Sequence, residues 1–167
     1  MGWFSPAYNG TIEMQDVPND FTDRIQRRVE SGLLVPGSRS RANYVVCEKS
    51  PNRIRFMADD FLTAYNVGLN SVVLQRDSPT TVTYHGQFWR WAIYAVVQAL
   101  VIATVVLLAV LAVPGARDQV SSYRGGWIYL GVLLAFFGLA WPWILVALHR
   151  RFAARALERI VRQTVAA

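Results

Sequence analysis

Few side chains in this sequence have the types and spacing that chemistry requires. A metal site needs clustered histidine, cysteine or carboxylate ligands, but the chain has one cysteine, Cys47, and two distant histidines, His85 and His149. Cys47 falls in a predicted strand, and we expect a small core residue there. His149 directly follows a long apolar run, so we interpret it as an interfacial residue and not as a pigment or haem ligand. We therefore predict no metal, no cofactor and no catalytic residue.

The adjacent carboxylates Asp59 and Asp60 are the remaining candidates for chemistry. Paired acids are typical of a helix N-terminus that faces water, where they complement the helix dipole. An enzyme acting at a membrane surface would need this pair to converge with His85 and Arg53 in one cleft. Nothing in the spacing predicts such convergence, so we expect a protein that is not an enzyme.

The positive charge is placed unevenly along the chain, which carries a net charge of +6. Basic and acidic residues balance in the first 89 residues. The remainder holds eight arginines against Asp118 and Glu158, which accounts for the whole excess. A nucleic-acid-binding protein would carry its basic patch on the soluble part. We therefore predict no nucleic-acid partner.

Two long apolar runs dominate the second half of the chain. Residues 91–113 contain no charged side chain and, as a helix, extend about 35 Å, enough to cross a bilayer core. Residues 126–148 form the second run, in which Pro142 removes a backbone hydrogen bond to Gly138 and predicts a kink. The residues between them read as a connecting loop. The pattern predicts a two-helix transmembrane hairpin over residues 89–148.

Arginine placement predicts the orientation of this hairpin. The connection carries Arg117 and Arg124, whereas the tail carries five arginines, and the more basic side of a span stays in the cytoplasm. The N-terminus lacks the features of a signal peptide. We expect an inner membrane protein (cytoplasmic or intracytoplasmic membrane) with both termini in the cytoplasm. Aromatic and basic residues expected at the membrane interface, in contact with anionic lipids, are Trp89, Arg90, Trp91, Trp127, Trp141, Trp143, Arg150, Arg151, Arg155, Arg159 and Arg162.

Residues 149–167 have the pattern of a basic amphipathic helix. Its apolar face comprises Ala153, Leu157, Ile160 with Val161, and Thr164, and arginines occupy another face. Three interpretations stay open: a topology anchor with a frayed end, a helix lying along anionic headgroups, and a helix docked on an acidic partner protein. Glu158 is placed to pair with Arg162 one turn later.

Residues 1–88 read as a small cytoplasmic α+β domain. A helix is predicted over residues 19–31, with Asn19 as N-cap, Gly32 after its end, and Phe21, Ile25 and Val29 on its apolar stripe. Strands are predicted over residues 11–15, 42–50, 52–58, 71–75 and 80–86, the last four as an antiparallel meander. The predicted fold class is therefore α+β: an antiparallel sheet with a helix, a two-helix transmembrane hairpin, and a basic amphipathic C-terminal helix.

Small residues at helical spacing suggest close helix packing in the hairpin. The two stripes comprise Ala92, Ala95, Ala99 and Ala103 on the first span, and Gly131, Ala135 and Gly138 on the second. They face either each other or another protein. The aromatic N-terminus, with Trp3, Phe4 and Tyr8, is typical of an arm laid on a partner.

These features predict a non-catalytic accessory or assembly subunit of a larger membrane complex, whether respiratory, photosynthetic or secretory. Its partners would be other integral membrane proteins. The alternative is a stand-alone lipid- or ligand-binding membrane protein, which requires an apolar pocket between the helix at 19–31 and the sheet.

Overall fold

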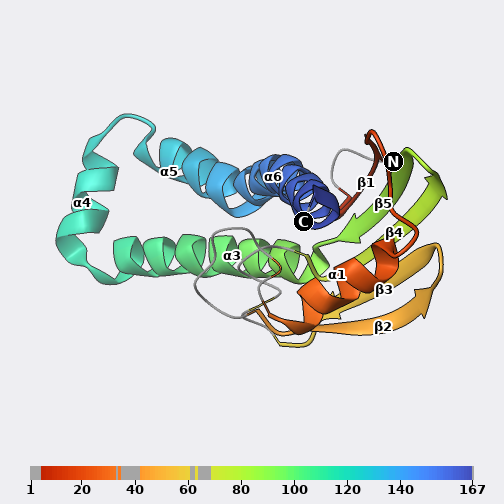
Figure 1. Ribbon diagram of the computed structural model, residues 1–167. Coiled ribbons are helices and arrows are strands. Elements are labelled where there is room, and N and C mark those ends of the chain that lie inside the picture. Colours follow the sequence, from red (N-terminus) through yellow and green to blue (C-terminus); the bar gives the residue numbers. More distant parts are fainter. Residues whose placement is uncertain (1–4, 33, 35–41, 61–62, 64–68, 167) are drawn as a thin grey trace. The chain divides into compact units, whose positions relative to one another are not determined.

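The structure is a computed structural model that describes residues 5–32, 34, 42–60, 63 and 69–166 (Figure 1). The chain divides into two compact units. Unit 1 comprises Met1–Trp91 together with His149–Ala167, and unit 2 comprises Ala92–Leu148. The C-terminal segment, expected to be a separate tail, is thus part of the same unit as the N-terminal domain. Unit 2 is an insertion between two pieces of unit 1.

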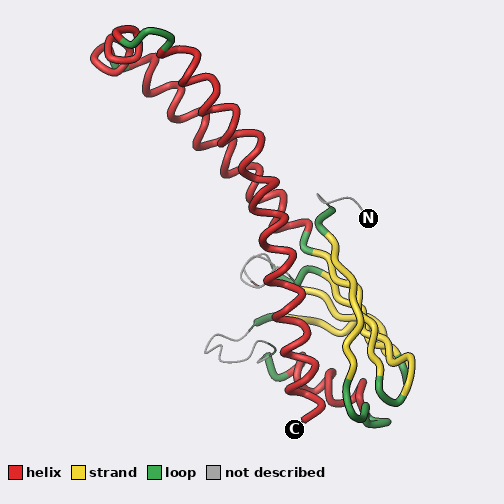
Figure 2. Tube along the Cα trace, turned by 90° about the horizontal axis from the view of Figure 1, so that it is seen from above, coloured by secondary structure: helices red, strands yellow, loops and turns green. Residues whose placement is uncertain are grey.

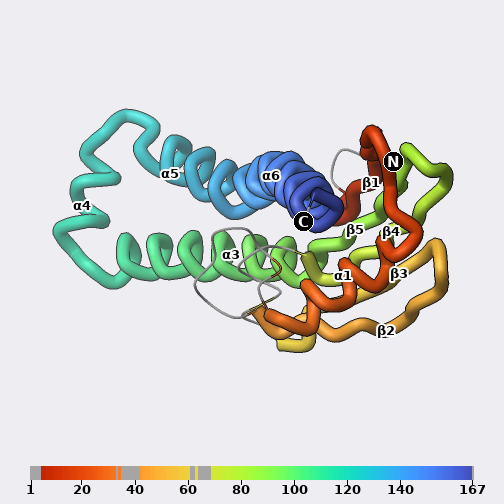
Figure 3. The backbone as a smooth tube through the Cα atoms, in the orientation of Figure 1, coloured from red at the N-terminus to blue at the C-terminus, as the bar shows by residue number. Residues whose placement is uncertain are grey.

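Unit 1 contains a five-stranded antiparallel sheet with the order β1-β5-β4-β3-β2, whose strands are labelled in Figure 1. The strands are β1 (Ala7–Glu13), β2 (Tyr44–Ser50), β3 (Arg53–Ala58), β4 (Ser71–Ser78) and β5 (Thr81–Gln87). The predicted four-stranded meander is confirmed. The first strand begins earlier than expected and adds to the edge of β5, so that the earliest and latest strands lie side by side (Figure 3).

One face of this sheet forms the core of unit 1. In β3, Ile54 and Phe56 are buried, while Arg53 and Arg55 are exposed on the other face, as their alternation predicts. Helix α1 (Phe21–Glu30) covers the buried face over β2 and β3 with its predicted apolar stripe. Figure 2 shows the C-terminal helix on the same side of the sheet. Unit 1 is therefore a two-layer α+β structure, and the α+β class is confirmed.

Two reciprocal tyrosine–glycine pairs fix the register between β1 and β5. Tyr8 lies opposite Gly86, and Gly10 lies opposite Tyr84. A Cβ atom at Gly86 would overlap the ring of Tyr8, and one at Gly10 would overlap the ring of Tyr84. Each ring therefore covers the glycine directly across the strand pair, an arrangement that pins the register because a shift would bring each ring against a side chain.

Unit 2 is helical. It contains most of α3 (Trp89–Ala112), then α4 (Pro114–Ser122), α5 (Gly126–Ala135), the π-helical segment η1 (Phe136–Ala140) and the start of α6 (Trp141–Ala166). The predicted loop between the two apolar runs is largely helical, which corrects our expectation. Pro114 stops α3 but occupies the first turn of α4, where proline has no hydrogen bond to lose and its fixed φ suits a helix.

The backbone irregularity expected at Pro142 is present just before that residue. Segment η1 ends at Ala140, and such π-helical turns accommodate a break in the regular hydrogen-bond ladder. Pro142 lacks the N–H that would bond back to Gly138, so the ladder is interrupted at this point. The two apolar runs are therefore one straight helix and one interrupted helix.

Both apolar runs are long and apolar enough to cross a membrane. Mean hydropathy over the most apolar window is 2.8 in Trp89–Ala112 and 2.1 in Gly126–Ala166, and only 11% and 17% of those windows are buried. A core helix of a water-soluble protein would instead be mostly buried. Exposed aliphatic side chains at this density point to a membrane location.

Candidate functional site

The C-terminal part of α6 packs against unit 1 along its apolar face. Ala153, Leu157, Ile160 and Val161 are at most 1% exposed, and Thr164 is 5% exposed. These are the residues that the helical pattern places on one face, so the amphipathic helix is confirmed. Because this face is buried within the protein, it is not available to lipid. The interpretation of a frayed tail is also wrong, since the segment is helical to Ala166.

A hydrogen bond between sheet and helix fixes the middle of this segment. The hydroxyl of Tyr84 donates to Oε1 of Glu158 at 2.9 Å. Burial, together with the hydrogen bond to the Glu158 carboxylate, raises the pKa of Tyr84 to about 12. Glu158 therefore bonds to β5 and not to Arg162, the partner that helical spacing predicts. Sequence spacing reveals only partners on the same helix.

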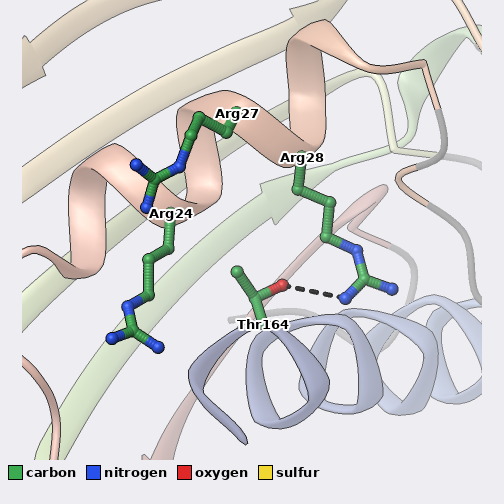
Figure 4. Close-up of a pocket in the computed structure, with 4 residues that line it drawn as sticks. All are labelled: Arg24, Arg27, Arg28 and Thr164. Atoms are coloured by element: carbon green, nitrogen blue, oxygen red, sulfur yellow. Dashed lines mark hydrogen bonds between the residues drawn. The ribbon is translucent and has the colours of Figure 1, made fainter. Parts of the chain in front are cut away.

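The last turn of α6 meets α1 in a basic groove of about 440 Å³, lined by Arg24, Arg27, Arg28 and Thr164 (Figure 4). Arg28 donates from Nη1 to Oγ1 of Thr164 at 3.1 Å and from Nη2 to Oε1 of Gln163 at 3.2 Å. Burial lowers the pKa of Arg28. The groove thus joins two helices that are distant in the sequence.

These arginines complement the end of α6. Arg24 donates from Nη1 to the carbonyl oxygen of Val165 at 3.4 Å, where the last carbonyls of a helix lack partners of their own. Cationic groups at a helix C-terminus also interact favourably with its dipole. Figure 4 shows Arg28 pointing at Thr164, whereas Arg27 points away from it. We conclude that Arg24 and Arg28 hold the docked helix in place.

Asp20, at the N-terminus of α1, contacts two of the groove arginines, Arg24 and Arg27. Its carboxylate accepts hydrogen bonds from Nε of Arg24 at 2.9 and 3.0 Å and lies 3.8 Å from Nη2 of Arg27. Asp20 is the N-cap residue, without a side-chain capping bond, in place of the predicted Asn19. Asn19 accepts a hydrogen bond from Arg76 at 2.8 Å. Gly32 has the positive φ of 71° expected beyond the helix end.

The outer side of α6 presents arginines. Arg151, Arg155, Arg159 and Arg162 are exposed and lie opposite the buried face. Among the residues that the structure describes, none of the four forms an ion pair within 4.0 Å. The five tail arginines thus differ in setting, because Arg150 is only partly exposed.

An aromatic cluster marks the start of the docked segment. His149 stacks on Trp91 with ring centroids 4.0 Å apart and an interplanar angle of 11°, and Phe88 lies 5.3 Å from the same imidazole. Its Nε2 is buried without a hydrogen-bond partner. Burial lowers the pKa of His149 to about 4. The ring therefore favours the neutral form and packs against its aromatic neighbours, while its place at a membrane interface stays a prediction.

The start of α3 is tied to unit 1 by a buried amide. Oδ1 of Asn70 accepts from the backbone N–H of Arg90 at 2.8 Å, and Nη1 of Arg90 donates to the carbonyl of Ala58 at 3.4 Å. The guanidinium carbon of Arg90 also lies 5.5 Å from the centre of the Trp89 ring. Sequence reasoning missed Asn70, since a helix cap supplied from 20 residues away has no local signal.

The remaining predicted interface and packing residues lie in different settings. The residues Trp89, Trp127, Trp141 and Trp143 are 37–45% exposed.

The two stripes of small residues approach each other at one point. A Cβ atom at Gly138 would lie 3.5 Å from that of Ala103. Gly131 has nothing within 4 Å of its Cβ position. Three alanines of the first stripe, Ala92, Ala95 and Ala99, are buried.

The predicted partner arm needs correction at Tyr8. Its ring is 1% exposed and packs against Tyr84 and Phe88 in the core of unit 1. Tyr8 is a core residue because β1 pairs with β5 and turns this side chain onto the buried face. Trp3 and Phe4, the other residues of the arm, lie outside the described residues.

The candidate chemical groups are not assembled into a site. His85 lies on β5 and Arg53 on β3, with β4 between them, so they are about 10 Å apart or more across the sheet. Asp59 accepts a bond from Asn43 at 3.4 Å, and Asp60 accepts one from the backbone of Thr63 at 2.6 Å. In the described part of the chain, no three His, Cys, Asp or Glu residues group as metal ligands.

Cys47 is exposed, and our expectation of a core cysteine is wrong. A register shift between Val46 and Glu48 in the pairing with β3 disturbs the alternation of β2 at this residue. β2 is also the edge strand, so no strand in the described part of the chain pairs along its outer side.

The interface between α1 and the sheet is filled by side chains. Phe21 and Ile25 of α1 and Phe56 of β3 are 0% exposed. At these positions the space between α1 and the sheet, where a ligand-binding domain would need an apolar pocket, holds side chains of the protein's own core. The two described grooves lie instead at the end of α6; arginines and Thr164 line the first, and polar and apolar residues together line the second.

No family model matches the chain, and no curated protein or solved structure matches it either.

Proposed function

We propose that this protein is a non-catalytic integral membrane protein that acts as an accessory or assembly subunit of a larger membrane complex. In this proposal unit 2 is a two-span hairpin, and unit 1 is a cytoplasmic binding module at the inner membrane. The observation that carries the proposal is the insertion of two exposed apolar helices into one α+β unit whose C-terminal piece completes its core.

The insertion favours a scaffold over a flexible tether. In unit 1 the chain enters α3 through the Asn70–Arg90 bond, and the returning segment begins at the Phe88–His149 contact. Both connections are made by residues with defined partners. Both ends of the inserted segment therefore start from ordered positions in unit 1, which suits a folded binding module in an assembly role.

The exposed Cys47, the chain's single cysteine, allows a direct test of topology. We expect a membrane-impermeant maleimide to label Cys47 in inside-out vesicles and not in sealed right-side-out vesicles. The matched variant, Cys47→Ser with Gln119→Cys, places the thiol on exposed α4 and should give the opposite pattern. Labelling of both positions from the same side would overturn the two-span arrangement.

The role as a subunit is tested by native mass after mild solubilisation from the protein's own membranes. We expect a discrete high-mass species with partners at fixed stoichiometry. Migration of the chain alone, as a monomer or homodimer, would contradict the proposal and favour a stand-alone lipid- or ligand-binding protein.

A further inference from the structure

The outer side of α6 carries a compact row of unpaired arginines, which we name the arginine face: Arg155, Arg159 and Arg162. Successive members are four and three residues apart, so they lie on one side of the helix over about 10 Å. All three are exposed, and no ion pair involves them among the described residues. The face therefore offers three guanidinium groups, each free to bind a carboxylate.

The arginine face is held rigidly by the side of the helix opposite to it. Leu157 and Ile160 are 0% exposed, and Glu158 accepts the hydrogen bond from Tyr84. A helix whose backbone is already ordered loses little conformational entropy when it binds a partner. This arrangement differs from a disordered basic tail, which would have to fold on binding.

Distance along the helix separates the arginine face from the predicted membrane interface. Measured along the axis from His149, which directly follows the predicted span, Arg155 lies at about 9 Å, Arg159 at about 15 Å and Arg162 at about 20 Å. Charges in water at physiological ionic strength are screened over about 8 Å. Arg150 and Arg151, next to His149, are better placed to meet lipid headgroups. The arginine face is accordingly better placed to meet a protein.

A second groove extends the arginine face toward the loop after β1. Arg162 and Arg24 line it together with Asp16, Val165 and Pro18, and its volume is about 480 Å³. The two arginines are partly offset by Asp16, so the groove is less positive than the face. If a partner segment binds along the arginine face, this groove therefore suits the end of that segment, where polar and apolar residues would both find contacts.

We propose that the arginine face docks an acidic helix of a partner protein. Carboxylates spaced four and three residues apart on that helix would match the three guanidinium groups, each able to form paired hydrogen bonds. The inference rests on the proposed role as a subunit, because it names the chemistry of one partner. It differs from that role in its test, since docking can fail while the topology and the native mass remain as expected.

The test uses the full chain in phosphatidylcholine nanodiscs and a labelled synthetic helical peptide with glutamates spaced four and three residues apart. We expect binding that weakens about ten-fold or more in Arg155→Gln/Arg159→Gln, with little change in the matched variant Arg53→Gln/Arg55→Gln. The matched pair removes the same charge from the exposed sheet face. A peptide with glutamine in place of glutamate should not bind.

Three results would overturn the docking proposal. Equal weakening in both double variants would show attraction to net charge alone. Loss of peptide binding when phosphatidylserine is added to the nanodisc would assign the arginine face to lipid. Tighter binding of a single-stranded RNA than of the peptide, with the same dependence on Arg155 and Arg159, would assign it to nucleic acid.

Discussion

Helix α3 and the docked segment of α6 are both long helices, but their apolar residues are distributed differently. On α3, Ile93, Val97 and Leu108 are 52–57% exposed, and aliphatic residues surround the helix. On the segment from His149 to Ala166, apolar residues form one buried face and arginines lie opposite. A helix that is apolar all round suits lipid, whereas one with two faces suits the boundary between a core and water. The difference teaches that α3 has the composition of a helix that could cross a membrane, whereas the docked segment of α6 is shaped to cover the core of unit 1.

The largest expected effect comes from Gly86→Val, which places a side chain where the ring of Tyr8 lies. Overpacking of this site should lower the free energy of unfolding of unit 1 by more than about 3 kcal/mol, because the added Cβ would overlap a fully buried ring. The control is Gly131→Val on α5, where nothing lies within 4 Å of the Cβ position. Pulse proteolysis of both variants in urea measures the change. Equal stability of the two variants would show that the tyrosine–glycine pairs do not restrain the sheet.

One leucine-to-alanine substitution in each of α6 and α3 compares how much a buried and an exposed leucine contribute to stability. Leu157→Ala removes a side chain that is 0% exposed, and we expect a loss of about 3 kcal/mol in unit 1. Leu108→Ala, at a position on α3 that is 57% exposed, should cost less than about 1 kcal/mol. Urea unfolding of both variants in nanodiscs provides the measurement. A small effect at Leu157 would mean that the docked helix contributes little to the core.

A smaller effect is expected at acidic pH from His149. Its pKa falls from 6.5 to about 4 in the folded protein, so folding favours the neutral ring. The resulting stability is complete above pH 6.5 and is lost as the pH falls toward 4. His149→Phe retains an aromatic ring against Trp91 but cannot be protonated. We expect the variant to lose less stability than the wild type between these pH values, and parallel profiles would refute this.

The smallest expected effect on stability is that of Arg155→Gln/Arg159→Gln. Both side chains are exposed and unpaired in the described part of the chain, so the free energy of unfolding should change by less than about 0.5 kcal/mol. Circular dichroism and urea unfolding check this. A loss above about 1 kcal/mol would show that the arginine face supports the fold and would weaken its assignment as a docking surface.

The sequence by itself determined the helices and strands whose apolar residues recur with a regular period. Alternation in β3 and the stripe of Phe21, Ile25 and Val29 placed the sheet and α1 correctly, since burial of one face imposes that period. The apolar runs, the stop at Pro114 and the irregularity near Pro142 follow from composition and from the missing N–H of proline. The amphipathic face of the tail was likewise visible from spacing alone.

Tertiary structure decided where those faces go. The helical pattern identifies Leu157 and Ile160 as apolar, but the surface that covers them comes from distant parts of the chain. The same holds for Tyr84 as the partner of Glu158, for Asn70 as the cap of α3, and for the burial of Tyr8. Spacing along a chain reports only neighbours within one element. Contacts between residues 20 or 74 positions apart depend on the strand order and on the return of α6 to unit 1.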